Sequence, residues 1–131
     1  MTKNKNFAVI GAGLVGSLLS IYLQRRGYQV TVLEKRPDIR LQRVDGGRSI
    51  NLALSTRGIR ALQEVGVSEE IGRIAIPMHG RMMHDLNGRL TFQPYGKQGQ
   101  FINSISRGSL NILLMNAAEK IGVRFLFNHQ V

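Results

Sequence analysis

The spacing of hydrophobic residues changes twice in the first 36 positions, and each change predicts a new element. Residues 7–10 form a short apolar run typical of a buried strand. Residues 17–26 carry apolar side chains at helical spacing, and Gly27 ends that helix. Residues 28–33 return to the pattern of a strand. This order of strand, helix and strand predicts a βαβ unit.

The turn between the first strand and the helix reads Gly11-Ala12-Gly13-Leu14-Val15-Gly16. Gly11 allows a tight turn, Gly13 lets the backbone approach a pyrophosphate, and Gly16 lets the helix pack closely on the strand. The N-terminus of the helix then offers unpaired N–H groups and the positive end of its dipole to phosphates. We therefore predict a nucleotide-binding site at this turn.

An acidic residue, Glu34, ends the second strand 18 positions after Gly16. A carboxylate at this place accepts hydrogen bonds from a ribose 2′-hydroxyl and repels a 2′-phosphate, which favours FAD or NAD over NADP. A glycine-rich turn alone is weak evidence, but here strand, helix, second strand and acid coincide. These residues leave the choice between FAD and NAD open.

The stretch from about residue 37 to 106 predicts an insertion with its own helices and strands. Apolar and polar residues partly alternate on either side of Asn87-Gly88, which predicts a β-hairpin over residues 78–95 with a two-residue turn. The other expected elements are an irregular loop (35–47), a short strand or extended piece (48–54), a helical hairpin (56–75) and a strand (101–106).

The last segment, from about residue 107 to 131, predicts a helix that ends at Gly122 and a strand that extends the first parallel sheet by a right-handed crossover. The chain as a whole thus predicts an α/β fold, with a Rossmann-like βαβ unit in residues 1–36, a parallel sheet and the inserted helical and hairpin segment. A doubly wound nucleotide-binding sheet has more than the three parallel strands expected here. We therefore interpret the chain as the N-terminal part of a longer domain, and expect its open sheet edges to favour self-association.

The amino-acid composition argues against several other kinds of site and partner. The 131 residues include no cysteine, which excludes disulfides, thiolate catalysis and cysteine-based zinc sites, and the three histidines fall at no metal-ligand spacing, so we predict no metal site. The net charge of +10 comes from scattered residues, which favours an anionic cofactor or substrate over nucleic acid. No stretch approaches about 18 apolar residues and the first strand follows the N-terminus directly, so we expect a cytoplasmic protein without a membrane span.

Several stretches outside the glycine turn carry a resemblance to a known family. They are GRSINLALSTRG (47–58), IPMHGRMMHDLNG (76–88), PYG (94–96) and SISRGSLN (104–111). With GAGLVGSLL and LEKRPD, they resemble the kynurenine 3-monooxygenases, a family of FAD-dependent aromatic hydroxylases, over nearly the whole chain. The resemblance implies FAD as cofactor, NADPH as co-substrate and transfer of one oxygen atom of O2 to the ring of L-kynurenine, ortho to its aniline nitrogen, which gives 3-hydroxykynurenine.

The resemblance also implies roles for individual residues. Those implied at FAD are Gly11, Gly13, Val15, Gly16, Leu33, Glu34, Lys35, Arg36, Ala53, Arg107 and Val131. Arg81 and Tyr95 match the pair that holds the carboxylate of the kynurenine side chain, and a guanidinium fork with a phenol beside it suits that ligand. On the residues alone, Arg81 fits a solvated strand position and Tyr95 a half-buried turn. Arg48 and Arg57 are weaker candidates for anion contacts.

No catalytic acid, base or nucleophile is expected in the chain, because the cofactor carries the chemistry. The family's second FAD motif and the far side of its substrate pocket would lie beyond Val131, so we expect no turnover from these residues alone. Three other functions stay open. They are a related FAD hydroxylase of another carboxylated aromatic substrate, an NAD-dependent oxidoreductase, against which the long insertion argues, and a non-enzymatic nucleotide- or anion-binding module.

Overall fold

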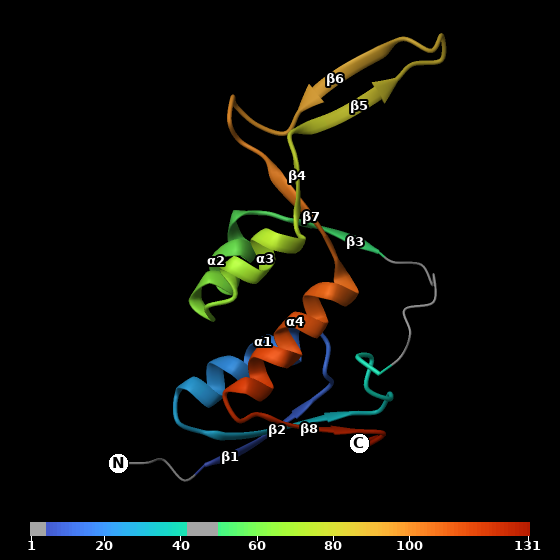
Figure 1. Cartoon of the computed structure of the whole chain (residues 1–131). Helices are drawn as coiled ribbons and strands as arrows, with labels where there is room; N and C mark the ends of the chain where they lie inside the picture. The colour runs from blue at the N-terminus through green and yellow to red at the C-terminus, as the bar shows by residue number, and fades with distance from the viewer. Residues whose placement is uncertain (1–4, 42–49) are drawn as a thin grey trace.

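The computed structural model describes residues 5–41 and 50–131. A parallel sheet forms its base, with the order β1 (Asn6–Ile10), β2 (Gln29–Glu34) and β8 (Arg124–Phe127) (Figure 1). In the register of the sheet, Val9 lies opposite Val32, and Val32 lies opposite Phe125. The predicted βαβ unit and the predicted return of the chain to the same sheet are therefore confirmed.

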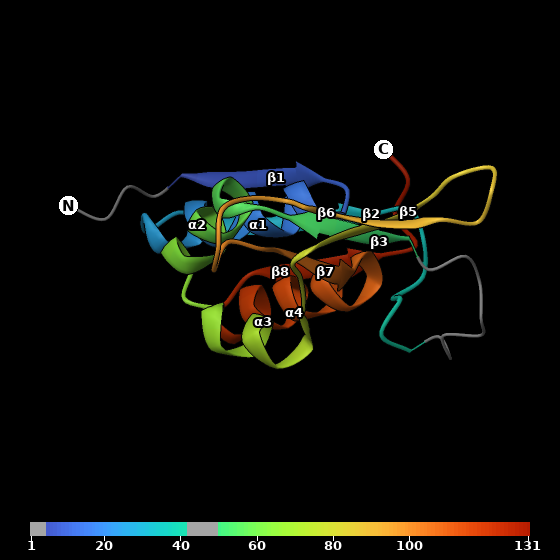
Figure 2. The same cartoon turned by 90° about the horizontal axis from the view of Figure 1, so that it is seen from above.

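Two helices, α1 (Leu14–Arg25) and α4 (Arg107–Lys120), pack side by side on one face of this sheet (Figure 2). The core lies between them and the strands, where Ile21, Val32 and Met115 are almost fully buried. The small buried residues Ser20 of α1 and Ala118 of α4 fit a close approach of the two helices. Helix α1 begins three residues earlier than its apolar spacing predicts, because Gly13 already serves as its N-cap.

The insertion forms a second, antiparallel sheet with the order β3 (Asn51–Leu54), β7 (Ile102–Ser106) and β4 (Ile76–Met78). Helices α2 (Thr56–Glu64) and α3 (Ser68–Ile74) follow β3 and confirm the predicted helical hairpin. Strand β7 runs directly into α4, so the second sheet is joined to the helix that returns the chain to the first sheet.

Strands β5 (Gly80–His84) and β6 (Leu90–Pro94) form the predicted hairpin, which extends away from both sheets (Figure 1). The predicted two-residue turn is wrong. Gly88 has φ +77°, but Asn87 does not have a positive φ. A hydrogen bond from Asp85 N to Arg89 O closes the loop, so the loop consists of residues 86–88. Asp85 Oδ1 accepts hydrogen bonds from the N–H groups of Asn87 and Arg89, which favours this three-residue loop over the tighter turn.

Side chains of α1 join the insertion to the βαβ unit. The Arg25 guanidinium donates to the carbonyls of Glu64 (2.7 Å) and Val65 (2.8 Å) at the C-terminus of α2. The Tyr22 hydroxyl donates to Ala61 O at 3.2 Å. Glu64 and Val65 are at the end of α2, where the last carbonyls lack partners within the helix, so these bonds from α1 help to fix where α2 lies.

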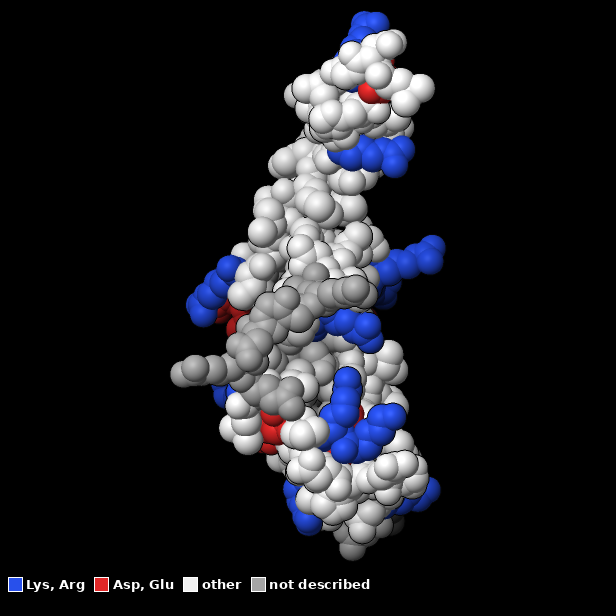
Figure 3. All heavy atoms as spheres, turned by 90° about the vertical axis from the view of Figure 1, so that its right-hand side faces the viewer, with Lys and Arg blue, Asp and Glu red and all other residues white. Residues whose placement is uncertain are grey.

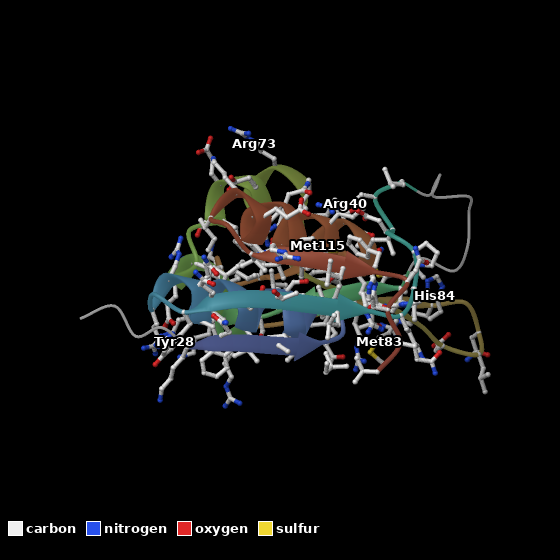
Figure 4. The ribbon with its side chains drawn as sticks, turned by 90° about the horizontal axis from the view of Figure 1, so that it is seen from below. Tyr28, Arg40, Arg73, Met83, His84 and Met115 are labelled. Atoms are coloured by element: carbon white, nitrogen blue, oxygen red, sulfur yellow. The ribbon has the colours of Figure 1, made fainter. Side chains whose placement is uncertain are left out.

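A charged cluster around Arg40 holds the segment after β2 against α4 (Figure 4). The Arg40 guanidinium contacts Asp38 (Nη2 to Oδ2, 2.7 Å) and Glu119 of α4 (Nη2 to Oε1, 3.0 Å). It also lies over the Phe127 ring of β8, 5.7 Å from the ring centre. The pKa of the Asp38 carboxyl is lowered, chiefly by its hydrogen bonds from Arg40. One largely buried guanidinium thus connects three segments that are distant in sequence.

Replacement of Arg40 by alanine should lower the free energy of unfolding by about 2–3 kcal/mol, because it leaves Asp38 and Glu119 without their cation. Chemical unfolding of the Arg40→Ala chain followed by circular dichroism measures the loss. Arg73→Ala is the matched control, since Arg73 pairs with Glu69 on the exposed side of α3 and should cost no more than about 0.5 kcal/mol. Equal losses in the two variants would show that the Arg40 cluster is as dispensable as a surface ion pair.

Candidate cofactor site

The carboxyl ends of β1, β2 and β8 meet at one edge of the parallel sheet, where nucleotides bind in α/β folds of this type. The glycine turn follows β1, residues 35 and 36 follow β2 after its last residue Glu34, and residues 128–131 follow β8. Backbone hydrogen bonds from Asn128 N to Arg36 O (3.3 Å) and from His129 N to Glu34 O (3.0 Å) join the last two segments. The structure therefore brings the glycine turn and residues 33–36 together and places residues 128 and 129 beside them, while the contact of Val131 with the cofactor stays a prediction.

The backbone of the glycine turn needs glycine at two positions. Gly11 has φ +96°, and its N–H donates to Leu33 O at 2.7 Å, which fixes the turn against β2. A Cβ added to Gly16 would lie 1.9 Å from Gly11 O, so only glycine lets α1 approach the turn this closely. The turn and close-packing roles predicted for Gly11 and Gly16 are confirmed.

Gly13 faces open space, because a Cβ added there would meet no atom within 4 Å. It is the N-cap of α1, where no side chain caps the helix and no acidic residue lies in the first turn. The first N–H groups of a helix lack partners within the helix and carry the positive end of its dipole. The neighbouring Val15 is 79% exposed. These features fit an anionic group such as a pyrophosphate over Gly13.

The backbone of Ala12, between the two glycines, is held by side chains from three elements. Its N–H donates to Glu34 Oε2 at 2.8 Å. Its carbonyl accepts from Asn111 Nδ2 of α4 at 2.9 Å and, more weakly, from Ser17 Oγ of α1 at 3.4 Å. Sequence reasoning did not identify Asn111 or Ser17. The available signal was an asparagine directly after Leu110 in the apolar stripe of α4, at a helical position that is expected to be buried.

Glu34 is buried, and its carboxylate already has protein donors. Oε1 accepts hydrogen bonds from the N–H and the Nε of Arg36, both at 2.9 Å, while Oε2 accepts from Ala12 N. The side-chain hydrogen bond from Arg36 is the main reason why the pKa of Glu34 falls to about 2, although burial opposes the shift. The carboxylate is therefore ionised at neutral pH and already orients the glycine turn. Its contact with a ribose hydroxyl stays a prediction.

Arg107 and Ala53 lie where the second sheet meets α4. Arg107 is the first residue of α4, one helical turn before Asn111, so the start of α4 lies close to the glycine turn. Its N–H donates to Ile50 O at 3.1 Å, and its side chain is exposed. Ala53 is exposed on β3 opposite Ser104 of β7. The long Arg107 side chain can therefore reach a ligand that extends from the glycine turn towards the second sheet, and the contact of both residues with a flavin stays a prediction.

Arg81 and Tyr95 lie on one face of the hairpin. Arg81 is opposite Gln93, and its Nε donates to Gln93 Oε1 at 2.7 Å. The N–H of Tyr95 donates to His79 O at 3.0 Å, which extends the same ladder. Since successive side chains of a strand alternate between faces, Arg81, Gln93 and Tyr95 share one side. Sequence reasoning did not identify Gln93, which orients Arg81.

The remaining basic candidates are less informative. Arg48 lies outside the described residues, and Arg57 is exposed on α2. On the face drawn in Figure 3, the Lys and Arg side chains of the described residues lie in separate groups. Among residues 5–41 and 50–131, no helix is long and apolar enough to cross a membrane. Within the same ranges, no group of acidic and histidine side chains is arranged to hold a metal ion.

The model of the FAD-binding domain family matches residues 5–131. The chain belongs to this FAD-binding domain family. It is 61% identical over 125 residues to a kynurenine 3-monooxygenase of Myxococcus xanthus and 54% identical over 127 residues to one of Cytophaga hutchinsonii. These matches cover 94% and 95% of this chain but 27% and 28% of the relatives, so the chain spans less than a third of their length. The resemblance stated from the sequence motifs is confirmed.

Solved structures of an oxygenase and a monooxygenase share the fold. The tetrameric form of 2-methyl-3-hydroxypyridine-5-carboxylic acid oxygenase superposes with a TM-score of 0.76 at 22% identity, over 96% of this chain and 32% of that one. The p-nitrophenol 4-monooxygenase PnpA from Pseudomonas putida gives a TM-score of 0.78 at 21% identity, over 100% of this chain and 33% of that one. The predicted α/β class with a parallel nucleotide-binding sheet is thereby confirmed.

The Glu34 carboxylate should make the stability of the FAD-binding edge depend on pH. Its pKa in the folded chain is about 2, below the ordinary value of 4.5, so its stabilising contribution is complete above about pH 5 and is lost as the pH falls towards 2. We expect about 1–3 kcal/mol at neutral pH, since the exposed Arg36 guanidinium is partly screened. Chemical unfolding of the chain and of Glu34→Gln at pH 7 and pH 3 measures it. The difference between the two should be largest at pH 7, smaller at pH 3 and lost below about pH 2, and a constant difference would contradict the assignment.

Proposed function

We propose that the protein carrying this chain is a kynurenine 3-monooxygenase that uses FAD, NADPH and O2 to convert L-kynurenine to 3-hydroxykynurenine. The observation that carries the proposal is the similarity to kynurenine 3-monooxygenases, which extends over both the glycine turn and the hairpin of Arg81 and Tyr95. In this proposal the chain supplies the adenosine and pyrophosphate end of the FAD site and one wall of the substrate site. No residue of the chain is assigned as a catalytic acid, base or nucleophile.

The residues at the sheet edge fit FAD in chemical type. The open space over Gly13 and the uncapped start of α1 suit a pyrophosphate, and Val15 would be covered by it. The ionised Glu34 suits a ribose with a free 2′-hydroxyl and disfavours a 2′-phosphate. Leu33, Lys35, Arg36 and Val131 would surround the adenosine end, while Arg107 and Ala53 would contact the part of the cofactor nearer the flavin ring.

When bound and reduced by NADPH, FAD supplies the activation of O2 and the transfer of one oxygen atom to the aromatic ring. The chain's own task would be to orient the substrate. The Nε of Arg81 is engaged by Gln93, while its two terminal nitrogens have no hydrogen-bond partner among the described residues. They can form two parallel hydrogen bonds to a carboxylate, and the Tyr95 hydroxyl on the same face can add a third. Such a clamp holds the amino-acid end of kynurenine and leaves its ring free to face the cofactor.

The decisive experiment uses the whole protein that carries this chain. We expect the purified protein to be yellow with bound FAD, to oxidise NADPH faster when kynurenine is present, and to release 3-hydroxykynurenine. A protein that takes up no flavin but binds NAD would favour an NAD-dependent oxidoreductase. Flavin uptake with stimulation by a different carboxylated aromatic compound in a substrate panel would favour a related hydroxylase.

A cytoplasmic location and the absence of a nucleic-acid partner stay predictions, as does self-association.

Replacement of Arg81 by alanine in that protein should raise the KM for kynurenine by between about tenfold and a hundredfold, because it removes a charged hydrogen-bonding partner of the carboxylate. Steady-state kinetics and the flavin absorbance measure the effect, and FAD content should stay unchanged. Arg89→Ala is the matched control, since Arg89 is an exposed arginine of the same hairpin near its loop. An unchanged KM in Arg81→Ala, or the same rise in Arg89→Ala, would remove Arg81 from the substrate site.

A further inference from the structure

Asn111 of α4 is the buried polar residue that the proposed function does not yet use. Asn111 is only 8% exposed. It follows Leu110 and lies about one helical turn before Leu114, and both leucines are in the core. Nδ2 donates to the Ala12 carbonyl at 2.9 Å, across 99 positions of sequence. It therefore links the return helix directly to the glycine turn.

The direction of the Ala12 carbonyl determines the direction of the Gly13 N–H. Both belong to the same planar trans peptide, so they point in opposite directions. Asn111 and Ser17 hold the carbonyl towards α4 and α1, which turns the Gly13 N–H away from the helices. On the other side of Ala12, Glu34 holds the N–H. Neither peptide plane at Ala12 can rotate without breaking one of these hydrogen bonds.

Asn111 is unfavourable for stability in one respect. Its Oδ1 is buried and has no hydrogen-bond partner among the residues that the structure describes. An unpaired buried acceptor costs stability, and a leucine of similar size would suit the apolar stripe of α4 better. A flipped amide would bring Oδ1 against the Ala12 carbonyl, where two acceptors repel, so the donation from Nδ2 is the orientation that the pair requires.

We propose that Asn111 is a positioning residue of the cofactor site, which fixes the Ala12–Gly13 peptide so that the Gly13 N–H is presented to the diphosphate of the cofactor. The proposal rests on the proposed FAD function. Asn111 does not itself contact the diphosphate but acts through the backbone of the turn. It explains why a polar side chain with an unpaired oxygen occupies a core position of α4.

The test is Asn111→Leu in the whole protein, with FAD affinity measured by fluorescence titration of the apoprotein. We expect FAD to bind about five- to tenfold more weakly, because one hydrogen bond that pre-orients the turn is lost. ADP, which contains the diphosphate but no flavin, should weaken by the same factor as a competitor of FAD. The melting temperature of the apoprotein should change little, since the variant removes the unpaired Oδ1 but leaves the Ala12 carbonyl with only the weaker bond from Ser17, whereas a purely structural role would lower it together with the affinity.

Asn116→Leu is the matched control, because Asn116 lies on the same helix and contacts Arg40 instead of the turn, and it should leave both affinities unchanged. If the leucine variant does not yield a folded apoprotein, Asn111→Ala replaces it. Unchanged FAD affinity would overturn the proposal and leave the proposed function intact. A loss for FAD without a loss for ADP would also overturn it, since the effect would then lie away from the diphosphate. Wild-type protein that binds no flavin would overturn both.

Discussion

The parallel pairing of β8 with β2 is the interaction on which the other features depend. It brings back a chain that has left the first sheet at Glu34 and returns only at Arg124. Closing a connection of about 90 residues costs about 4 kcal/mol in loop entropy. Burial of side chains such as Leu114 and Met115 contributes about 1.5–3 kcal/mol each, so two or three core residues of α4 and β8 offset that cost. The insertion between the two strands can therefore be long without opening the sheet.

The same pairing assembles the cofactor edge from distant pieces of sequence. Because β8 lies beside β2, its last residues reach Glu34 and Arg36, and α4 is placed against α1. Asn111 then meets Ala12, and Glu119 meets Arg40. The glycine turn is thus shaped partly by its own glycines and partly by side chains that follow the insertion. A turn with the same glycines but without α4 would lack the shorter of the two hydrogen bonds to the Ala12 carbonyl and keep only the weaker one from Ser17.

Much of this arrangement follows from local sequence, and the remainder depends on contacts that no local pattern encodes. Gly11 and Gly16 could be assigned because the turn needs a positive φ at one and no Cβ at the other. The hairpin could be located from the sequence, but the length of its loop could not. The same Asn-Gly pair permits a two-residue and a three-residue loop, and hydrogen bonds to the Asp85 side chain favour the longer one. Asn111 was missed because its partner lies 99 positions away, and the periodicity of α4 marks that position only as buried.

The charge of Glu34 determines which of the two nucleotides of the proposed enzyme, FAD or NADPH, can bind at this edge. Glu34 is buried, and the donors Arg36 and Ala12 keep its pKa near 2, so its negative charge is present at every physiological pH. A 2′-phosphate placed against it would meet a fixed anion in a poorly solvated position, where repulsion is stronger than in water. The Arg36 guanidinium is paired with Glu34 through its Nε, so part of its charge is already balanced by that carboxylate. In the proposed enzyme the adenosine of FAD would therefore occupy this edge, and NADPH would bind elsewhere.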